Sequence, residues 1–207
     1  MQASTQHSIT LIRHGPPAVS LRQKVRGHQF RQFVERYDAA KITQRALPPL
    51  AVRQVVSQAD YVFASSRPRA MHTAELLGVI APPVVDPQFR EIEFPVDFPR
   101  YLRFSALVWS VIALLLWRMG YSSRSESLAR ARARAYAAAD LLESYLKGPL
   151  PGCSEGRGEG RDEGRGAVVL VAHAGINRLI AKELRKRGWR GPRMPRSQHW
   201  GCTTYCR

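Results

Sequence analysis

Two apolar runs that each end at a histidine constrain the fold of this chain more than any other feature. Residues 167–172 are uninterrupted, apolar and rich in β-branched side chains, which is typical of a strand buried in a parallel sheet. His173 follows this run, and a similar run at residues 8–12 is followed by Arg13 and His14. Because parallel strands end at a common edge of a sheet, we expect these side chains to converge there.

Strand and helix patterns alternate along the rest of the chain, which predicts an α/β domain with a mostly parallel sheet. At 207 residues the chain has the length of one such domain with a substantial core. Further strands are predicted at residues 61–64 and 84–85, and a closing strand is predicted in the residues before Arg207. Helices are predicted at residues 29–40, 50–58, 68–77, 124–147 and 176–187.

The most apolar segment, residues 104–117, contains no charged residue and lies between Arg103 and Arg118. As a helix it would be about 21 Å long, whereas the hydrocarbon core of a bilayer is roughly 30 Å thick. Its length and its flanking arginines favour an interior helix or a lid over a membrane anchor. Contact with a membrane surface stays open as a third interpretation.

Two further features follow this apolar segment. Ser123 and Glu126 fit a capping box at the start of the next helix, whose Arg130, Arg132 and Arg134 are expected on a solvated face. Residues 148–166 are rich in Gly, Arg and Glu, with little that could form a core, and they predict a flexible surface insertion.

Arginine dominates the charge of the chain, since Lys and Arg total 32 against 16 Asp and Glu, a net charge of +16. The guanidinium group matches phosphate and carboxylate oxygens, so we expect an anionic substrate or partner. A phosphate ester, a nucleic acid and an anionic membrane surface all meet this criterion, and a compositional bias toward arginine would explain the charge without a ligand. Because the sequence contains no recognised nucleic-acid-binding module, we expect a small phosphorylated substrate and no nucleic acid.

The cysteines and the N-terminal residues bear on localisation. Cys153, Cys202 and Cys206 are odd in number and form no convincing disulfide framework, which suits a reducing compartment. The first eight residues are polar and lack the apolar core of a signal peptide. We therefore expect free thiols, no transmembrane segment and a cytoplasmic location.

The predicted sheet edge collects groups that are suited to phosphoryl transfer. Arg69 follows the strand predicted at residues 61–64, so two histidines and two arginines are expected together. Arginines bind phosphoryl oxygens and stabilise the charge that grows in the transition state. A neutral histidine nitrogen can attack phosphorus, and a carboxylic acid can protonate the leaving oxygen. Glu91, in the segment after the third predicted strand, is the candidate acid.

Four segments of the sequence, taken together and in order, resemble the histidine phosphatase superfamily. They are Leu11-Ile12-Arg13-His14-Gly15, Ser65-Ser66-Arg67-Pro68-Arg69-Ala70 with Thr73-Ala74-Glu75, Phe89-Arg90-Glu91-Ile92-Glu93-Phe94, and the stretch from Val169 to Gly175. The resemblance implies a phosphoglycerate mutase-like fold: one three-layer α/β/α domain with a helical cap inserted at about residues 95–147. The chain departs from the usual family pattern at Pro16, Pro17 and Ala174, positions that face the substrate.

The resemblance also implies a role for each of five residues. His14 would be the nucleophile and would pass through a phosphohistidine. Arg13, Arg69 and His173 would hold the phosphoryl group, and Glu91 would be the proton donor. Neither a metal nor another cofactor is implied.

Several alternatives stay open at this point. Glu93 and Asp97 are also candidates for the acid, because its position varies within the superfamily. Phosphatase activity on a phosphate monoester is the favoured reaction, since the chain is short for a glycolytic mutase and lacks the wider mutase signature. The other two interpretations are mutase-type phosphoryl transfer and a non-catalytic protein that binds a phosphorylated ligand or phosphoprotein on the same fold.

Overall fold

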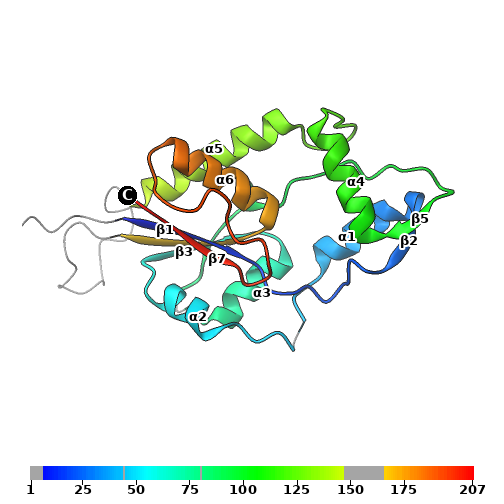
Figure 1. The fold of residues 1–207 in the computed structure, drawn as a ribbon. Helices are drawn as coiled ribbons and strands as arrows, with labels where there is room; N and C mark the ends of the chain where they lie inside the picture. Colours follow the sequence, from blue (N-terminus) through cyan, green and yellow to red (C-terminus); the bar gives the residue numbers. More distant parts are fainter. Residues whose placement is uncertain (1–6, 44, 80, 147–165) are drawn as a thin grey trace, which may run out of the picture.

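A computed structural model describes residues 7–43, 45–79, 81–146 and 166–207 of the chain. Its centre is a five-stranded sheet with the strand order β4-β3-β6-β1-β7 (Figure 1). The strands are β1 (Ser8–Arg13), β3 (Tyr61–Ser65), β4 (Val84–Asp86), β6 (Ala167–Ala172) and β7 (Cys202–Cys206). Only β7 is antiparallel to its neighbour, so the predicted mostly parallel α/β sheet is confirmed.

The two apolar runs of the sequence, β1 and β6, lie side by side in the middle of the sheet. Parallel pairing sets Arg13 opposite Ala172, so the two strands end at the same level. The backbone N–H of His14 then donates to the carbonyl of Ala172 over 3.0 Å. This register delivers His14 and His173 to one edge, which is the convergence that the sequence predicts.

Helices cover both faces of the sheet and make three layers (Figure 1). On one face, α2 (Leu50–Ser57) and α3 (Pro68–Leu77) pack on side chains such as Ile12 and Val171. On the other face, α5 (Leu128–Ser144) and α6 (Ala174–Lys186) pack on side chains such as Leu11 and Leu170. Helix α3 starts with proline at its first position and ends at Gly78, whose φ of 78° is the left-handed conformation that closes many helices.

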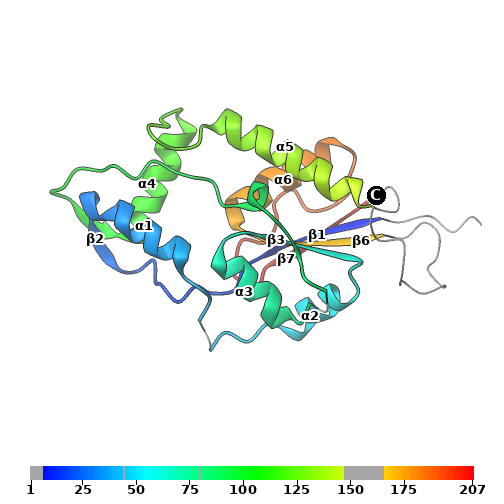
Figure 2. The same ribbon diagram turned by 180° about the vertical axis from the view of Figure 1, so that it is seen from behind.

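The remaining elements lie beyond one end of the sheet (Figure 2). We call β2 (Lys24–Arg26), α1 (Phe30–Ala39), β5 (Arg103–Ser105) and α4 (Ala106–Arg118) the cap. The cap has its own apolar cluster around Phe30, Phe33 and Trp109, separate from the two clusters on the sheet. Short 3-10 helices, η1 (Gly27–Gln29) and η2 (Pro87–Phe89), precede α1 and the segment that holds Glu91.

The structure corrects two of the local predictions. The apolar helix starts at Ala106, because Phe104 pairs with Val25 in an antiparallel β2–β5 ribbon that the sequence pattern does not reveal. The next helix starts at Leu128 with the Ser127 side chain as its cap, so the predicted capping box at Ser123 is wrong. That helix, α5, packs on the sheet through its alanines and Leu142, although it falls within the predicted cap region 95–147.

The predicted Gly/Arg/Glu-rich insertion at residues 148–166 lies, except for Gly166, outside the described residues. Cys153 lies outside them as well, while Cys202 and Cys206 are free thiols on β7. Among the described parts of the chain, no helix combines the length and apolar character that crossing a membrane requires.

Candidate active site

His14 and His173 face each other across the end of the sheet. Their ring centroids are 5.1 Å apart and the planes are inclined by 62°. Only 2% of His14 and none of His173 is exposed. Buried polar groups cost free energy unless they are paired, so each ring needs hydrogen-bond partners inside the protein.

Two hydrogen bonds fix the tautomer of His14. Its Nδ1 lies 2.7 Å from the carbonyl oxygen of Gly15, which can only accept, so Nδ1 carries the hydrogen. Its Nε2 lies 3.3 Å from Nε of Arg69, which can only donate, so Nε2 carries the lone pair. His14 is therefore a neutral imidazole whose Nε2 lone pair is directed at a cation.

The surroundings keep both histidines neutral. Burial, followed by the charge of Arg69, lowers the pKa of His14 well below its ordinary value. The same two causes, in the same order, lower the pKa of His173. At neutral pH both rings are therefore unprotonated, and the positive charge at this edge comes from the arginines.

Arg69 is held in place by the end of α1. Its Nη1 donates to a carboxylate oxygen of Asp38 over 3.1 Å and to the carbonyl of Tyr37 over 3.2 Å. The other oxygen of Asp38 pairs with Arg67 at 3.0 Å. Since Arg69 is only 2% exposed, Asp38 supplies the counter-charge that makes its burial tolerable.

Arg13, at the end of β1, points its guanidinium toward the C-terminal loop. Its Nη1 donates to the carbonyl of Ser197, while its buried Nε has no hydrogen-bond partner within the described residues. An unsatisfied N–H of this kind is a donor that a bound anion would satisfy. Arg13 thus lies in the predicted group with one donor still available.

His173 is oriented by the strand next to its own. Its Nε2 lies 2.9 Å from Oγ of Ser65, the last residue of β3. Its buried Nδ1 has no partner in the part of the chain that the structure describes. One ring nitrogen is therefore used for positioning and the other is free to contact a ligand.

Glu91 joins the group through the N-terminus of α6, which begins directly after His173. Its carboxylate accepts from the backbone N–H of Gly175 over 3.2 Å and of Ile176 over 3.0 Å. A side chain at position 175 would bring Cβ within 2.5 Å of a Glu91 oxygen, so any residue other than glycine would push the Glu91 carboxylate out of this position. This contact gives a physical reason for the glycine two residues after His173.

The other two candidate acids lie elsewhere. Asp97 forms an ion pair with Arg31 at 2.8 Å, and its side chain is 47% exposed. Glu93 is exposed and lines a neighbouring cavity. Of the three candidates, Glu91 alone is bonded to the helix that follows His173.

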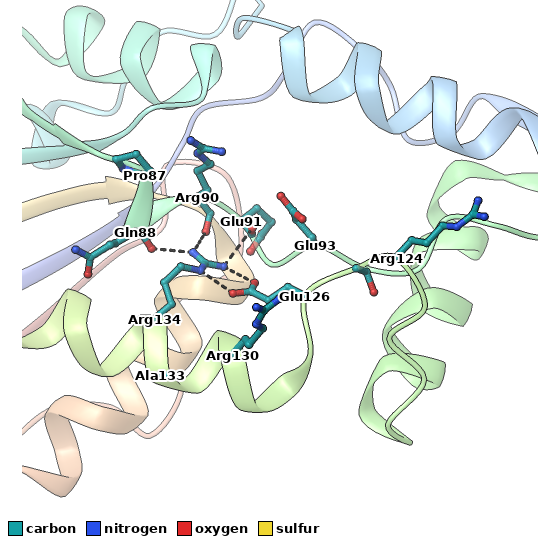
Figure 3. A pocket seen from close by; sticks show the side chains of 11 residues that line it. Pro87, Gln88, Arg90, Glu91, Glu93, Arg124, Glu126, Arg130, Ala133 and Arg134 are labelled. Atoms are coloured by element: carbon teal, nitrogen blue, oxygen red, sulfur yellow. Dashed lines mark hydrogen bonds and ion pairs between the residues drawn. The ribbon is translucent and has the colours of Figure 1, made fainter.

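Arg134 fixes the segment that carries Glu91, so the prediction of a solvated face for this residue is wrong. Its guanidinium pairs with Glu126 at 2.6 Å and donates to the carbonyls of Gln88 and Arg90 over 2.7 Å (Figure 3). The exposed fractions of the paired side chains are 19% and 14%. Glu126 thus serves this ion pair rather than a capping box.

A cavity of about 780 Å³ opens on the Glu91 side of this group (Figure 3). The segment 87–93, the turn 124–126 and the start of α5 line it, and its basic residues are Arg90, Arg124, Arg130 and Arg134. Neither His14 nor His173 lines it, since both are covered. The cavity therefore adjoins the acid and leaves the histidines enclosed.

Sequence reasoning missed a third histidine at the site. Nδ1 of His199 donates to the carbonyl of His14 over 3.2 Å, and the two ring centroids are 5.3 Å apart. Burial, and then the charge of Arg13, lower its pKa. His199 belongs to the loop before β7, which is tied to Arg13 by a backbone bond from Trp200. This loop has no periodic pattern, so no local signal in the sequence points to His199.

Small polar residues connect the elements of the site. Thr73 Oγ1 accepts from the backbone N–H of Gly15 over 3.0 Å and donates to the carbonyl of Arg69 over 2.6 Å. The side chain of Asn177 donates to the carbonyl of Ile12 over 3.1 Å. Thr73 thus links β1 to α3, and Asn177 links β1 to α6. Over the described residues, no three His, Cys, Asp or Glu side chains form a group that could hold a metal ion.

Solved structures that superpose on most of the chain identify the fold. The product of open reading frame Rv3214 from Mycobacterium tuberculosis superposes with a TM-score of 0.57 at 18% identity, covering 96% of this chain and 90% of that one. A phosphoserine phosphatase from Entamoeba histolytica gives 0.55 at 15% identity, covering 96% and 89%. A mycobacterial glucosyl-3-phosphoglycerate phosphatase gives 0.52 at 19% identity, covering 86% and 82%.

No family model matches the sequence, and no curated protein matches it either. The similarity is therefore one of three-dimensional fold. The chain thus has the three-layer α/β fold of these structures, the phosphoglycerate mutase-like fold.

Proposed function

We propose that this protein is a phosphatase that hydrolyses a phosphate monoester through a phosphohistidine on His14. The observation that carries the proposal is the state of that ring: a buried, neutral imidazole with its lone pair fixed on Nε2 by two independent hydrogen bonds. A non-catalytic phosphate site needs arginines, but it has no need of a preserved nucleophilic lone pair.

In the first step, Nε2 of His14 attacks phosphorus as the bond from phosphorus to the ester oxygen breaks. Nδ1–H keeps its bond to the Gly15 carbonyl, which supports the positive charge that the ring acquires. As Nε2 uses its lone pair, the Nε–H of Arg69 is released and turns to the phosphoryl oxygens. Arg13 Nε–H is a second donor, and His173 Nδ1–H is a third in the tautomer whose Nε2 accepts from Ser65. Glu91 gives its proton to the leaving oxygen, which departs as an alcohol.

In the second step, water attacks the phosphohistidine and the bond from phosphorus to Nε2 breaks. The Glu91 carboxylate, now ionised, takes the proton of that water, so the acid and base are the same residue. Inorganic phosphate leaves, and Nε2 regains its lone pair. The cavity beside Glu91 gives the leaving group a place on the side where the acid lies.

Turnover of a generic aryl phosphate by the wild type and His14→Ala tests the proposal. We expect the substitution to lower kcat by about a thousandfold or more, since it removes the group that forms the covalent intermediate. His28→Ala, which changes an exposed histidine in the cap, should leave kcat unchanged. A panel of phosphate esters then addresses the substrate.

The phosphoenzyme distinguishes this reaction from the alternatives. Trapped protein should carry phosphate that is labile in acid and stable in base, as expected for phosphohistidine. Turnover that survives His14→Ala, or an acid-stable phosphoenzyme, would show that the mechanism is wrong. Binding of phosphate without turnover would instead identify a phosphate-binding protein, and transfer to a second phosphorylated substrate would identify a mutase.

A further inference from the structure

Helix α4 has two apolar faces, of which the protein covers one. Trp109, Ala113 and Trp117 are at most 3% exposed and pack into the cap and against α5. Leu107, Val111 and Leu115 repeat every four residues on the opposite side and are 51%, 49% and 55% exposed. A helix in water normally places polar side chains on its outer face, so this face lacks a partner.

The exposed apolar surface extends beyond the helix at both ends. We call the following residues the α4 patch: Tyr101, Leu102, Phe104, Leu107, Val108, Val111, Leu115, Met119 and Tyr121, which are all between 38% and 80% exposed. They come from one continuous stretch of chain: the two residues before β5, β5 itself, α4 and the turn after it. A patch of this kind usually marks a surface that binds something.

The charge around the α4 patch has a single sign. Residues 98–125 contain four arginines, at positions 100, 103, 118 and 124, and no aspartate or glutamate. All four are exposed, and none forms an ion pair with an acid among the described residues. Strand β2, paired with β5, adds the exposed Lys24 and Arg26.

The acids that border this stretch are already neutralised. Asp97 pairs with Arg31, and Glu126 pairs with Arg134. The surface therefore presents aliphatic and tyrosine side chains among uncompensated positive charges.

We propose that the α4 patch docks the protein on an anionic lipid surface. Aliphatic side chains that enter the lipid, tyrosines at the level of the headgroups and arginines that reach the phosphates are the composition of interfacial helices. A helix of 13 residues, about 20 Å long, lies along such a surface without spanning it. The docking needs neither the histidines nor turnover.

A second copy of the chain is a poorer occupant. A two-fold contact through the α4 patch would set the arginines of one copy against those of the other, which is unfavourable in a surface that excludes water. An acidic protein would satisfy the charges but would have to match a broad surface of separate aliphatic side chains. A fluid bilayer meets both requirements without shape matching.

Sedimentation with vesicles tests the proposal on the full chain at low salt. The wild type should bind vesicles of phosphatidylcholine mixed with phosphatidylglycerol and should not bind phosphatidylcholine alone. Val111→Gln with Leu115→Gln should weaken binding by about tenfold or more, since two apolar side chains no longer enter the lipid. Arg103→Gln with Arg118→Gln should weaken it by roughly fivefold for each charge.

Matched variants on the body of the protein serve as controls. Leu47→Gln with Leu50→Gln changes two apolar side chains that are 83% and 71% exposed, and it should leave binding unchanged. Arg185→Gln with Arg190→Gln removes the same charge from exposed positions outside the cap. Circular dichroism melting shows that each variant is folded, whether or not the protein has phosphatase activity.

The proposal is wrong if the wild type does not bind the mixed vesicles, or if the Leu47 and Leu50 variant loses as much binding as the α4 variant. Equal binding to neutral vesicles would also overturn it, because the arginines would then contribute nothing. A wild-type dimer that becomes monomeric in the α4 variant, without vesicle binding, would assign the patch to a second copy.

Discussion

Two Asp–Arg pairs have almost the same geometry: one lies at the sheet edge, where Asp38 of the cap helix α1 reaches Arg69, and the other lies at the surface of the cap. Arg69 and Asp38 are 3.1 Å apart at the sheet edge, and Arg31 and Asp97 are 2.8 Å apart in the cap. The exposed fractions differ: 2% and 22% for the first pair, 44% and 47% for the second. An ion pair in water contributes little, whereas a buried charge becomes costly when its partner is removed, so burial rather than distance separates the two pairs.

Removing the carboxylate from each pair should give the largest difference in the free energy of unfolding. Asp38→Ala leaves the Arg69 charge buried without its counter-ion, and we expect the free energy of unfolding to fall by about 3 kcal/mol. Asp97→Ala should lower it by less than about 1 kcal/mol, because both side chains are solvated. Urea denaturation of the two variants measures this difference, and equal losses would show that Asp38 does not support Arg69.

The buried histidines of the sheet edge and the exposed histidine of the cap should also differ in how they make stability depend on pH. The folded state holds His14 and His173 with a lowered pKa, whereas in the unfolded chain each titrates near pH 6.5. As the pH falls below about 6.5, the unfolded chain takes up these protons first. The free energy of unfolding should then fall by up to about 1.4 kcal/mol per pH unit for each histidine.

Denaturation at about pH 7.5 and at about pH 5.5 measures this slope. His173→Asn should reduce it, since one of the two buried rings is gone. His28→Asn, in the cap and exposed, should leave it unchanged. A wild-type stability that is flat across this range would contradict the neutral, buried state of the two rings.

Substitutions of two glycines should have the smallest effect on stability, and only one of the two should affect activity. In Gly175→Ala the new Cβ would lie 2.5 Å from the Glu91 carboxylate, so we expect the acid to move and turnover of the aryl phosphate to fall by about tenfold or more. In Gly120→Ala, at the end of α4, nothing lies within 4 Å of the new Cβ, but the φ of 96° is unfavourable for alanine.

Both glycine substitutions should lower the free energy of unfolding by roughly 1 kcal/mol. Only the one at the sheet edge should change turnover. If Gly175→Ala turned over substrate like the wild type, Glu91 would not need its place at the N-terminus of α6. If Gly120→Ala reduced turnover as well, the cap would take part in the reaction.

The sequence by itself determined the sheet and the ends of its strands. The run at residues 167–172 can only be buried, and a buried strand followed by His173 and a helix places that histidine at the sheet edge whatever the rest of the chain does. The same reasoning holds for His14 and for Arg69 after β3. Local patterns are sufficient here because burial, strand direction and the start of the next helix are properties of a few consecutive residues.

The tertiary structure decided what these residues contact. Asp38, Ser65 and His199 reach the site from α1, from β3 and from the loop before β7, and no short-range pattern connects those segments with His14. The choice among Glu91, Glu93 and Asp97 also depends on which carboxylate meets the N-terminus of α6. These contacts join residues far apart in the chain, so they follow from how the layers pack.

The apolar segment 104–117, most of which forms α4, shows both what composition determines and what packing determines. Its apolar composition predicted a helix that is interior or a lid, and one face does form the core of the cap. Whether the other face is covered depends on what packs against it, and in this fold nothing among the described residues covers Leu107, Val111 and Leu115. Composition determines that a side chain prefers to leave water, but only the packed structure determines whether it can.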